Sequence, residues 1–273
     1  MYDFLYKKQD EGANKFVLTL ALICVATFLG GAILLFSPAL AKGKALLKNL
    51  PKKAELIVIL PENCDNCFDI YQVSDFLESV VGVKYKKVKE YNSDETNADL
   101  LIKAYDIKNL PTFIVKGDLK DLKLDELFSE ENIGQYDDNV FVYKNYFPPY
   151  YSIEEGKVRG EFEITYLTDE KCIGCYDVHL HDVALQNLVM TPTASSTVDV
   201  STTEGKDLLN KYQIKHAPTM LLMGDLNAYQ NFNELWKTVG TVESDGTYIF
   251  REDGLKLMGV YENVWTKVLY NKE

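Results

Sequence analysis

The chain has 273 residues, 47% of them hydrophobic and 26% charged, which gives room for two globular domains and argues against intrinsic disorder. Its net charge of −12 excludes nucleic acid as a partner, because phosphate backbones are bound by basic surfaces. Of the five cysteines, four form two Cys-x-x-Cys pairs and one lies in an apolar run, so none is left to build a disulfide-stapled secreted scaffold.

The apolar run covers residues 16–41 and contains no charge. The part before Pro38, residues 16–37, has 22 residues, enough for a helix that crosses a hydrocarbon core of about 30 Å. We therefore expect a short tail at 1–15 and a transmembrane anchor at 16–41 that contacts the lipid bilayer through residues 16–37. A cleaved signal peptide is the alternative, because Ala39-Leu40-Ala41 has the small-x-small form of a cleavage site.

The orientation of this anchor depends on two opposing arguments. Three lysines precede the run and five follow it within residues 42–53, a count that alone would keep the rest of the chain in the cytoplasm. Long domains, however, translocate largely regardless of local charge, and domains outside the cytoplasm need a tether. We expect a single-pass membrane protein whose domains are extracytoplasmic.

After the anchor, the chain repeats itself. A Cys-x-x-Cys pair and a later Pro-Thr each occur twice, as Cys64–Cys67 and Cys172–Cys175, and as Pro111-Thr112 and Pro218-Thr219. The cysteine pairs are offset by 108 residues, the Pro-Thr pairs by 107, and a third matching stretch, 133–143 and 239–250, by 106. Landmarks that share nearly one offset indicate a duplicated domain.

Both copies predict the same elements in the same order, from apolar periodicity and turn residues. The expected elements are strands from residues 54 and 161, helices at 68–81 and 176–189, strands at 82–91 and 194–200, helices after 93 and 201, and strands from 112 and 219. This order predicts an α/β fold in which helices cover a mixed sheet. We expect domains at 52–150 and 158–273, with the aromatic segment 147–160 as the linker between them.

Each cysteine pair is expected where a strand leads into a helix N-terminus. One helical turn would bring the two sulfurs together, and the partial positive charge at the helix start favours the thiolate at the first position. Cys64 and Cys172 are therefore the expected nucleophiles. Cys67 and Cys175 would resolve the mixed disulfide.

Each copy resembles a thioredoxin-fold domain, and the tandem arrangement resembles protein disulfide oxidoreductases that are built from two thioredoxin units. The resemblance is carried by the cysteine pairs and by the run Tyr-x-Ile-Lys-x-x-Pro-Thr, which occurs at residues 105–112 and 212–219. It implies two tandem thioredoxin-like domains after the transmembrane helix.

The same resemblance implies a site and a function. It implies cis peptide bonds at Leu110–Pro111 and Ala217–Pro218, with these four residues forming a substrate-binding loop. It also implies protein thiols or disulfides as partners and no cofactor or metal beyond the redox-active disulfides. The expected function is therefore that of a membrane-anchored thiol–disulfide oxidoreductase.

Some positions depart from the family pattern. Asn63 and Lys171 replace the usual tryptophan before the first cysteine, and Val58 and Tyr166 stand where many members bury a carboxylate. Asp65 should raise the pKa of a neighbouring thiol through like-charge repulsion. We therefore expect the second pair, which contains no acidic residue, to be the more reactive.

Two other functions stay open. Cys172, Cys175, His179 and His216 could bind zinc or copper(I) if the fold brings them together. Alternatively, both pairs could be inert disulfides in an interaction module, because a fold does not prove a function.

Overall fold

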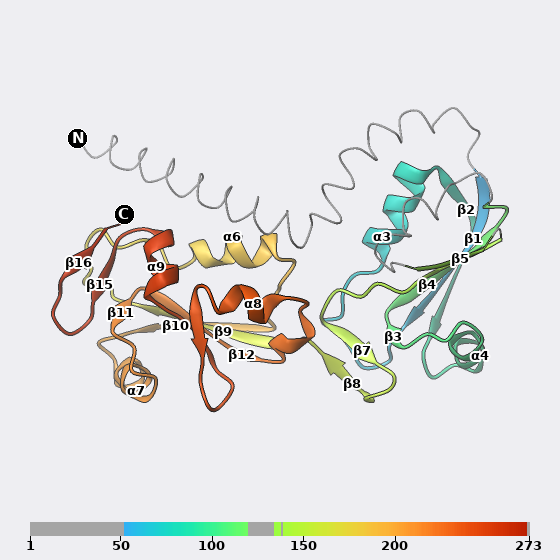
Figure 1. Ribbon diagram of the computed structural model, residues 1–273. Helices are drawn as coiled ribbons and strands as arrows, with labels where there is room; N and C mark the ends of the chain where they lie inside the picture. Colours follow the sequence, from blue (N-terminus) through green and yellow to red (C-terminus); the bar gives the residue numbers. More distant parts are fainter. Residues whose placement is uncertain (1–51, 120–133, 138, 272–273) are drawn as a thin grey trace. The chain divides into compact units, whose positions relative to one another are not determined.

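The computed structural model describes residues 52–119, 134–137 and 139–271 (Figure 1). They divide at the Arg159–Gly160 bond into an N-terminal unit, residues 52–159, and a C-terminal unit, residues 160–271. The expected tail at 1–15 and transmembrane anchor at 16–41 lie outside the described residues. Within the described ranges, no helix is long and apolar enough to span a bilayer.

The N-terminal unit is built on a five-stranded sheet with the order β2-β1-β4-β6-β5. Its strands are β1 (Lys52–Leu60), β2 (Val83–Asn92), β4 (Thr112–Gly117), β5 (Gly134–Asp137) and β6 (Val140–Tyr143). β1 and β2 run parallel, and the remaining neighbours are antiparallel. The parallel pair requires a crossover, which is made by α3 (Tyr71–Phe76) and the π-helical turn η1 (Leu77–Val81).

The C-terminal unit has the same plan, with the order β10-β9-β12-β14-β13. Its strands are β9 (Phe162–Thr168), β10 (Ala194–Asp199), β12 (Thr219–Gly224), β13 (Gly240–Val242) and β14 (Tyr248–Phe250). Again only the first two strands are parallel, and α6 (Leu180–Asn187) lies in the crossover between them. Both units are therefore α/β with a mixed five-stranded sheet, so the predicted α/β class with mixed sheets is confirmed for the described part of the chain.

Helices pack on both faces of each sheet (Figure 1). In the N-terminal unit, Ile70 and Leu77 contribute to one apolar core, while α4 (Thr96–Ala104) contributes Ala98 to the core on the other face. In the C-terminal unit, α6, α8 (Phe232–Trp236) and α9 (Glu252–Met258) pack into one core and α7 (Thr203–Lys211) into the other. A short 3-10 turn, η2 (Leu226–Ala228), follows β12.

A small second sheet completes each unit. In the N-terminal unit it consists of β3 (Asn109–Leu110), β7 (Tyr150–Ser152) and β8 (Lys157–Arg159). In the C-terminal unit it consists of β11 (His216–Ala217), β15 (Tyr261–Asn263) and β16 (Leu269–Tyr270). The segment expected to be a linker, 147–160, therefore contributes the hairpin β7–β8 to the N-terminal unit. That expectation was wrong because the partner strand β3 lies about 40 residues earlier in the chain.

The helices after the cysteine pairs begin later than the sequence predicts. The residue that follows each pair donates its backbone N–H to a distant carbonyl, Phe68 to Pro149 at 2.9 Å and Tyr176 to Val260 at 2.8 Å. These tertiary bonds hold the chain in a non-helical path, so α3 starts at Tyr71 and α6 at Leu180. The cysteines consequently lie in turns ahead of the helices, and a helix N-terminus does not supply the charge expected for thiolate stabilisation.

The threonine of each Pro-Thr has a structural role. Thr112 Oγ1 donates to the carbonyl of Tyr143 at 2.5 Å, and Thr219 Oγ1 donates to that of Phe250 at 2.6 Å. Both threonines are 0% exposed, so these hydroxyls would otherwise be buried without a partner. The hydroxyl thus ties the strand after the proline to the end of the neighbouring strand.

Replacing Thr219 by valine should destabilise the C-terminal unit by about 1–3 kcal/mol, because the carbonyl of Phe250 is left buried and unsatisfied. Both tryptophans of the chain, Trp236 and Trp265, belong to this unit, so urea unfolding followed by tryptophan fluorescence reports on it alone. Thr219→Ser should retain most of the stability. Thr112→Val is the matched control and should leave this transition in place; an unchanged transition in Thr219→Val would contradict the assignment.

Candidate functional site

Both cysteine pairs are closed disulfides. Cys64 is bonded to Cys67 with a Cα–Cα distance of 5.3 Å, and Cys172 is bonded to Cys175 with a distance of 5.6 Å. All four cysteines are partly exposed, at the end of the turn that leaves the first strand of each sheet. The disulfides therefore lie at the surface of their units, where another thiol can reach them.

The structure brings each pair to the expected proline loop. Leu110–Pro111 and Ala217–Pro218 are cis peptide bonds, and all four residues are buried. The sulfur of Cys67 lies 3.9 Å from the carbonyl oxygen of Leu110. The sulfur of Cys175 lies at the same distance, 3.9 Å, from that of Ala217. In both units, the second cysteine therefore faces the carbonyl that precedes the cis-proline.

A third cis bond, Pro148–Pro149, was not expected. It lies in the segment before β7, residues 144–149, which forms no helix, whereas the equivalent segment before β15 forms α9. The aromatic ring of Phe147 packs against that of Phe68, with centroids 5.0 Å apart. Aromatic packing therefore covers the base of the first site, where a helix covers the second.

A buried polar network lies behind the second pair. The hydroxyl of Tyr176 donates to the carbonyl of Pro218 at 2.8 Å and lies 3.0 Å from Nε2 of His181. Since that hydroxyl donates to Pro218, its oxygen accepts from a protonated Nε2. Burial lowers the pKa of His181 to about 3 and raises that of Tyr176, so both groups are neutral at physiological pH. The network therefore attaches the cis-proline loop to the residue after Cys175.

The first site has no such network, because apolar residues stand at the equivalent positions. Phe68 follows Cys67 as Tyr176 follows Cys175, and Val73 corresponds to His181. Sequence analysis missed the network, although a comparison of the two copies at the established offset would have drawn attention to these two polar replacements.

A second polar cluster, which we call the clasp, consists of Asp169, Glu262 and Lys267. Nζ of Lys267 lies 2.5 Å from Oδ2 of Asp169 and 2.9 Å from Oε1 of Glu262. Both carboxylate side chains are buried, at 2% and 7% exposure. Asp169 also accepts at its backbone oxygen from the N–H of Cys172, at 3.0 Å. The clasp thus connects the turn before the second disulfide to the hairpin β15–β16.

The two acids of the clasp have shifted pKa values in opposite directions. Burial and the contact with Asp169 raise the pKa of Glu262. Burial also acts on Asp169, but hydrogen bonding with Glu262 and Lys267 outweighs it and lowers the pKa of that carboxyl. The lysine therefore compensates one carboxylate, and the second acid is held closer to its neutral form. Nothing in the local sequence signalled this cluster, because Lys267 lies 98 residues beyond Asp169.

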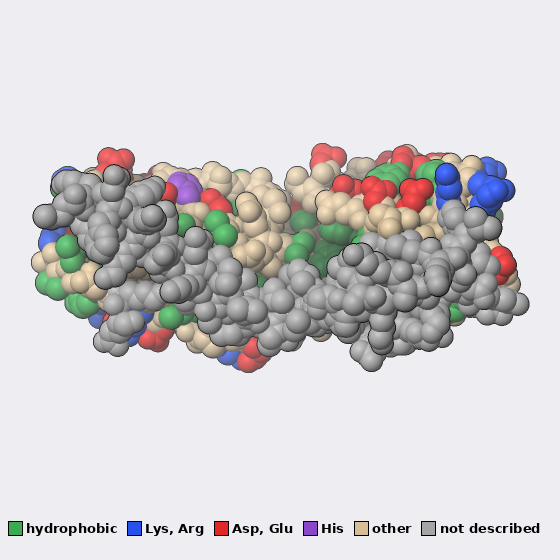
Figure 2. Space-filling model, turned by 90° about the horizontal axis from the view of Figure 1, so that it is seen from above, with side chains coloured by type: hydrophobic (Ala, Val, Ile, Leu, Met, Phe, Trp, Pro, Cys, Tyr) green, Lys and Arg blue, Asp and Glu red, His purple; other side chains and the backbone are tan. Residues whose placement is uncertain are grey.

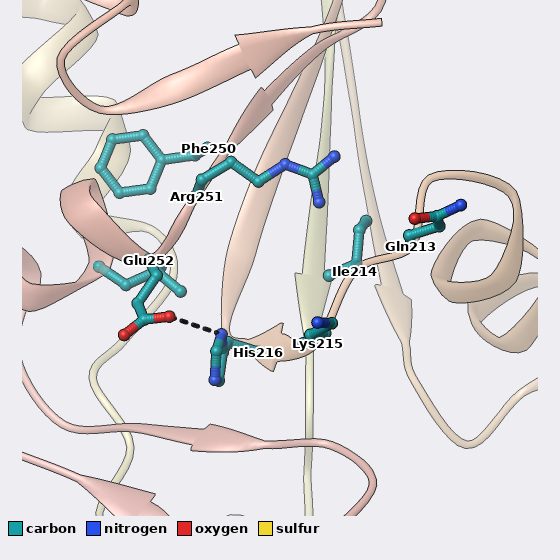
Figure 3. Close-up of a pocket in the computed structure, with 8 residues that line it drawn as sticks. Gln213, Ile214, Lys215, His216, Phe250, Arg251 and Glu252 are labelled. Atoms are coloured by element: carbon teal, nitrogen blue, oxygen red, sulfur yellow. Dashed lines mark ion pairs between the residues drawn. The ribbon is translucent and has the colours of Figure 1, made fainter.

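The histidines that a metal would need have other contacts. Nδ1 of His179 lies 3.4 Å from Asp182, and its ring packs 4.6 Å from that of Tyr166. Nδ1 of His216 lies 3.9 Å from Glu252 at a pocket whose lining includes neither cysteine (Figure 3). Within the described ranges, no group of three or more His, Cys, Asp or Glu is arranged to hold a metal ion.

Val58 and Tyr166 stand at the two positions where the sequence comparison with the thioredoxin pattern would expect a buried carboxylate, and both are buried. Val58 is 0% exposed and packs in the core of the N-terminal unit. Tyr166 is 3% exposed, and its hydroxyl donates to Asp182. Burial is the main reason why the pKa of Tyr166 is raised, so this group stays protonated.

Comparisons with known proteins give weak similarity. No family model matches the sequence, and no curated protein matches it. Among solved structures, a protein disulfide oxidoreductase from Aeropyrum pernix is 15% identical over 68% of this chain and 82% of its own, with a TM-score of 0.21. The NTD_N/C domain of alkylhydroperoxide reductase AhpF from Enterococcus faecalis is 14% identical over 67% and 88%, with a TM-score of 0.20. Scores this low do not establish a family, so the fold assignment rests on strand order and on the paired sites.

Removing the positive charge of Lys267 from the clasp should destabilise the C-terminal unit in a pH-dependent way. In Lys267→Met, two buried carboxyls lose their cation, so their pKa values rise above those of the unfolded chain. The stability of the variant then falls as the pH rises through these raised values. We expect a loss of about 1–3 kcal/mol at pH 8 and a smaller loss at pH 5, since the half-exposed ammonium is partly screened.

Urea unfolding followed by tryptophan fluorescence at both pH values measures this effect. Lys237→Met is the control, because Lys237 pairs with Glu234 on the surface, where both side chains are exposed, at 68% and 72%. The control should change stability little at either pH. Equal losses at pH 5 and pH 8 in Lys267→Met would show that the clasp carries no uncompensated charge.

Proposed function

We propose that the protein is a thiol–disulfide oxidoreductase that acts on cysteines of other proteins through its two Cys-x-x-Cys pairs. One observation carries the proposal: in both units, an accessible disulfide lies with its second sulfur 3.9 Å from the carbonyl that precedes a cis-proline. The same arrangement occurs twice in one chain. This repetition favours exchange chemistry over an inert module.

The chemistry follows from the partial exposure of both cysteines in each pair. A thiolate of the client attacks the sulfur of Cys64 or Cys172, the S–S bond breaks, and the electron pair leaves on Cys67 or Cys175. A second client thiolate then attacks the client sulfur of the mixed disulfide. The client gains a disulfide, and the pair gains two electrons and, on protonation, two protons. In the opposite direction, the reduced pair attacks a client disulfide by the same steps.

The two sites differ in the residues between their cysteines. Asp65 and Asn66 stand in the first pair, and Ile173 and Gly174 in the second. We propose that the second pair exchanges faster, since the carboxylate of Asp65 repels a neighbouring thiolate. No organic cofactor is needed for the steps above, and the electrons come from or go to another thiol.

Cysteine variants of the full chain test the function. With dithiothreitol as reductant, the protein should catalyse insulin reduction, and Cys172→Ser should remove most of this activity. Cys175→Ser should accumulate a mixed disulfide with insulin, because the resolving thiol is missing, whereas Cys172→Ser should not. Pairs that resist millimolar dithiothreitol and show no exchange would identify the protein as an inert module.

We also propose that residues 16–41 anchor the protein and that both units lie outside the cytoplasm. The support is the length of the uncharged run and the need of extracytoplasmic domains for a tether. The full chain should remain in the membrane fraction after an alkaline carbonate wash, and a variant lacking 16–41 should be released. After mild reduction of intact cells, an impermeant maleimide should label the pairs. An N-terminus after Ala41 in the mature protein would instead identify a cleaved signal peptide.

A further inference from the structure

Four large apolar side chains are exposed close to the second disulfide. Ile173, between the two cysteines, is 94% exposed. Trp265, Val268 and Leu269, on the hairpin β15–β16, are 58%, 49% and 52% exposed. We call these four residues the apolar rim. Figure 2 shows exposed hydrophobic side chains at the left of the picture, the side on which Figure 1 draws β15 and β16.

The clasp holds the hairpin next to the disulfide. Lys267, between Trp265 and Val268, contacts Asp169 at 2.5 Å, and Asp169 accepts the N–H of Cys172 at 3.0 Å. On the other side, Glu262 pairs in register with Ala217, whose carbonyl lies 3.9 Å from the sulfur of Cys175. The hairpin is thus linked to Cys172 by the ion pair of Lys267 with Asp169 and the hydrogen bond from Cys172, and it pairs with the strand whose carbonyl contacts Cys175.

The hairpin is ordered, so its apolar side chains are not exposed for lack of structure. Oδ1 of Asn263 accepts the N–H groups of Trp265 and Thr266, each at 3.0 Å. The rings of Tyr261 and Tyr270 stack with their centroids 5.3 Å apart and an interplanar angle of 11°. A fixed surface of this kind can bind a partner without a large ordering penalty.

The first site shows that the fold does not require such a rim. Asp65 and Asn66, between its cysteines, are exposed and polar. The tip of its equivalent hairpin, β7–β8, carries the exposed acids Glu154 and Glu155. Among the described residues, the exposed apolar side chains between the cysteines and at the hairpin tip therefore occur at the second site.

We propose that the apolar rim docks an extended segment of a client polypeptide that carries large apolar side chains next to its cysteine. This inference rests on the proposed function, because exchange joins the client sulfur to Cys172 and so places the flanking residues over Ile173. At about 3.3 Å per extended residue, a few residues on either side of the cysteine reach the hairpin.

The experiment uses the full chain with Cys64→Ser and Cys67→Ser, and its second pair is reduced with dithiothreitol that is then removed, so that only Cys172 and Cys175 react. The thiolate of Cys172 attacks the peptide sulfur and glutathione leaves; Cys175 then releases the peptide thiol and closes the disulfide. Two probe peptides of equal length carry one cysteine as a mixed disulfide with glutathione, flanked by Leu and Phe in one and by Ser in the other. The apolar peptide should react about tenfold faster, measured as the second-order rate constant of a single turnover, through burial of apolar area. Adding Trp265→Ser and Leu269→Ser should bring the two rates close to each other.

Val242→Ser is the matched control, since Val242 is 52% exposed in the same unit but lies on β13, outside the rim. It should keep the tenfold preference, and all variants should react with dithiothreitol at the same rate. Equal rates for the two peptides in the Cys64→Ser, Cys67→Ser chain would refute docking at the apolar rim, but would not contradict the proposed oxidoreductase function. A rim variant that sediments as a smaller species would overturn it too, by assigning the surface to self-association. A pair inert to dithiothreitol and peptides would refute the oxidoreductase and, with it, the docking.

Discussion

One main-chain hydrogen bond in each unit determines where the cysteine pair lies. The N–H of the residue after the second cysteine donates to a carbonyl just before the last hairpin, Phe68 to Pro149 and Tyr176 to Val260. A helix that started at the first cysteine would use that N–H internally. Because it is used across the fold, the cysteine turn is held beside the small sheet, whose edge strand (β3 or β11) ends just before the cis-proline. The spacing between sulfur and carbonyl follows from this constraint.

The constraint is met by two different sets of side chains. Around the first pair, Phe68 packs on Phe147 beside the Pro148–Pro149 bend, and the contacts are apolar. Around the second, hydrogen bonds from Tyr176 and within the clasp hold the same segments. Both arrangements place the second sulfur 3.9 Å from the carbonyl. The backbone geometry of the site is therefore insensitive to whether its support is apolar or polar, which leaves the electrostatics free to differ.

Sequence reasoning found what is local or repeated. The strands that begin at Thr112 and Thr219 were predicted because an apolar run follows a Pro-Thr at one offset, and the cis bonds followed from the resemblance. Sequence reasoning failed for segments whose structure depends on a contact with residues far away in the chain. The sequence predicts a linker where the hairpin β7–β8 lies, because only the pairing of β7 with β3 reveals a strand there. The start of α6 and the link from Asp169 to Lys267 likewise depend on contacts across the fold.

The differences between the copies are concentrated in segments that the sheets do not constrain. The residues between the cysteines and those at the tip of the last hairpin pair with no strand of the five-stranded sheets, so they can change without altering the core. In the function that we propose, they are the residues next to the sulfur to which a client is joined. Exchange itself needs only the two sulfurs and the backbone at the proline. A duplicated scaffold can therefore keep one chemistry and present two unlike surfaces, one acidic and one apolar, to the chains that it meets.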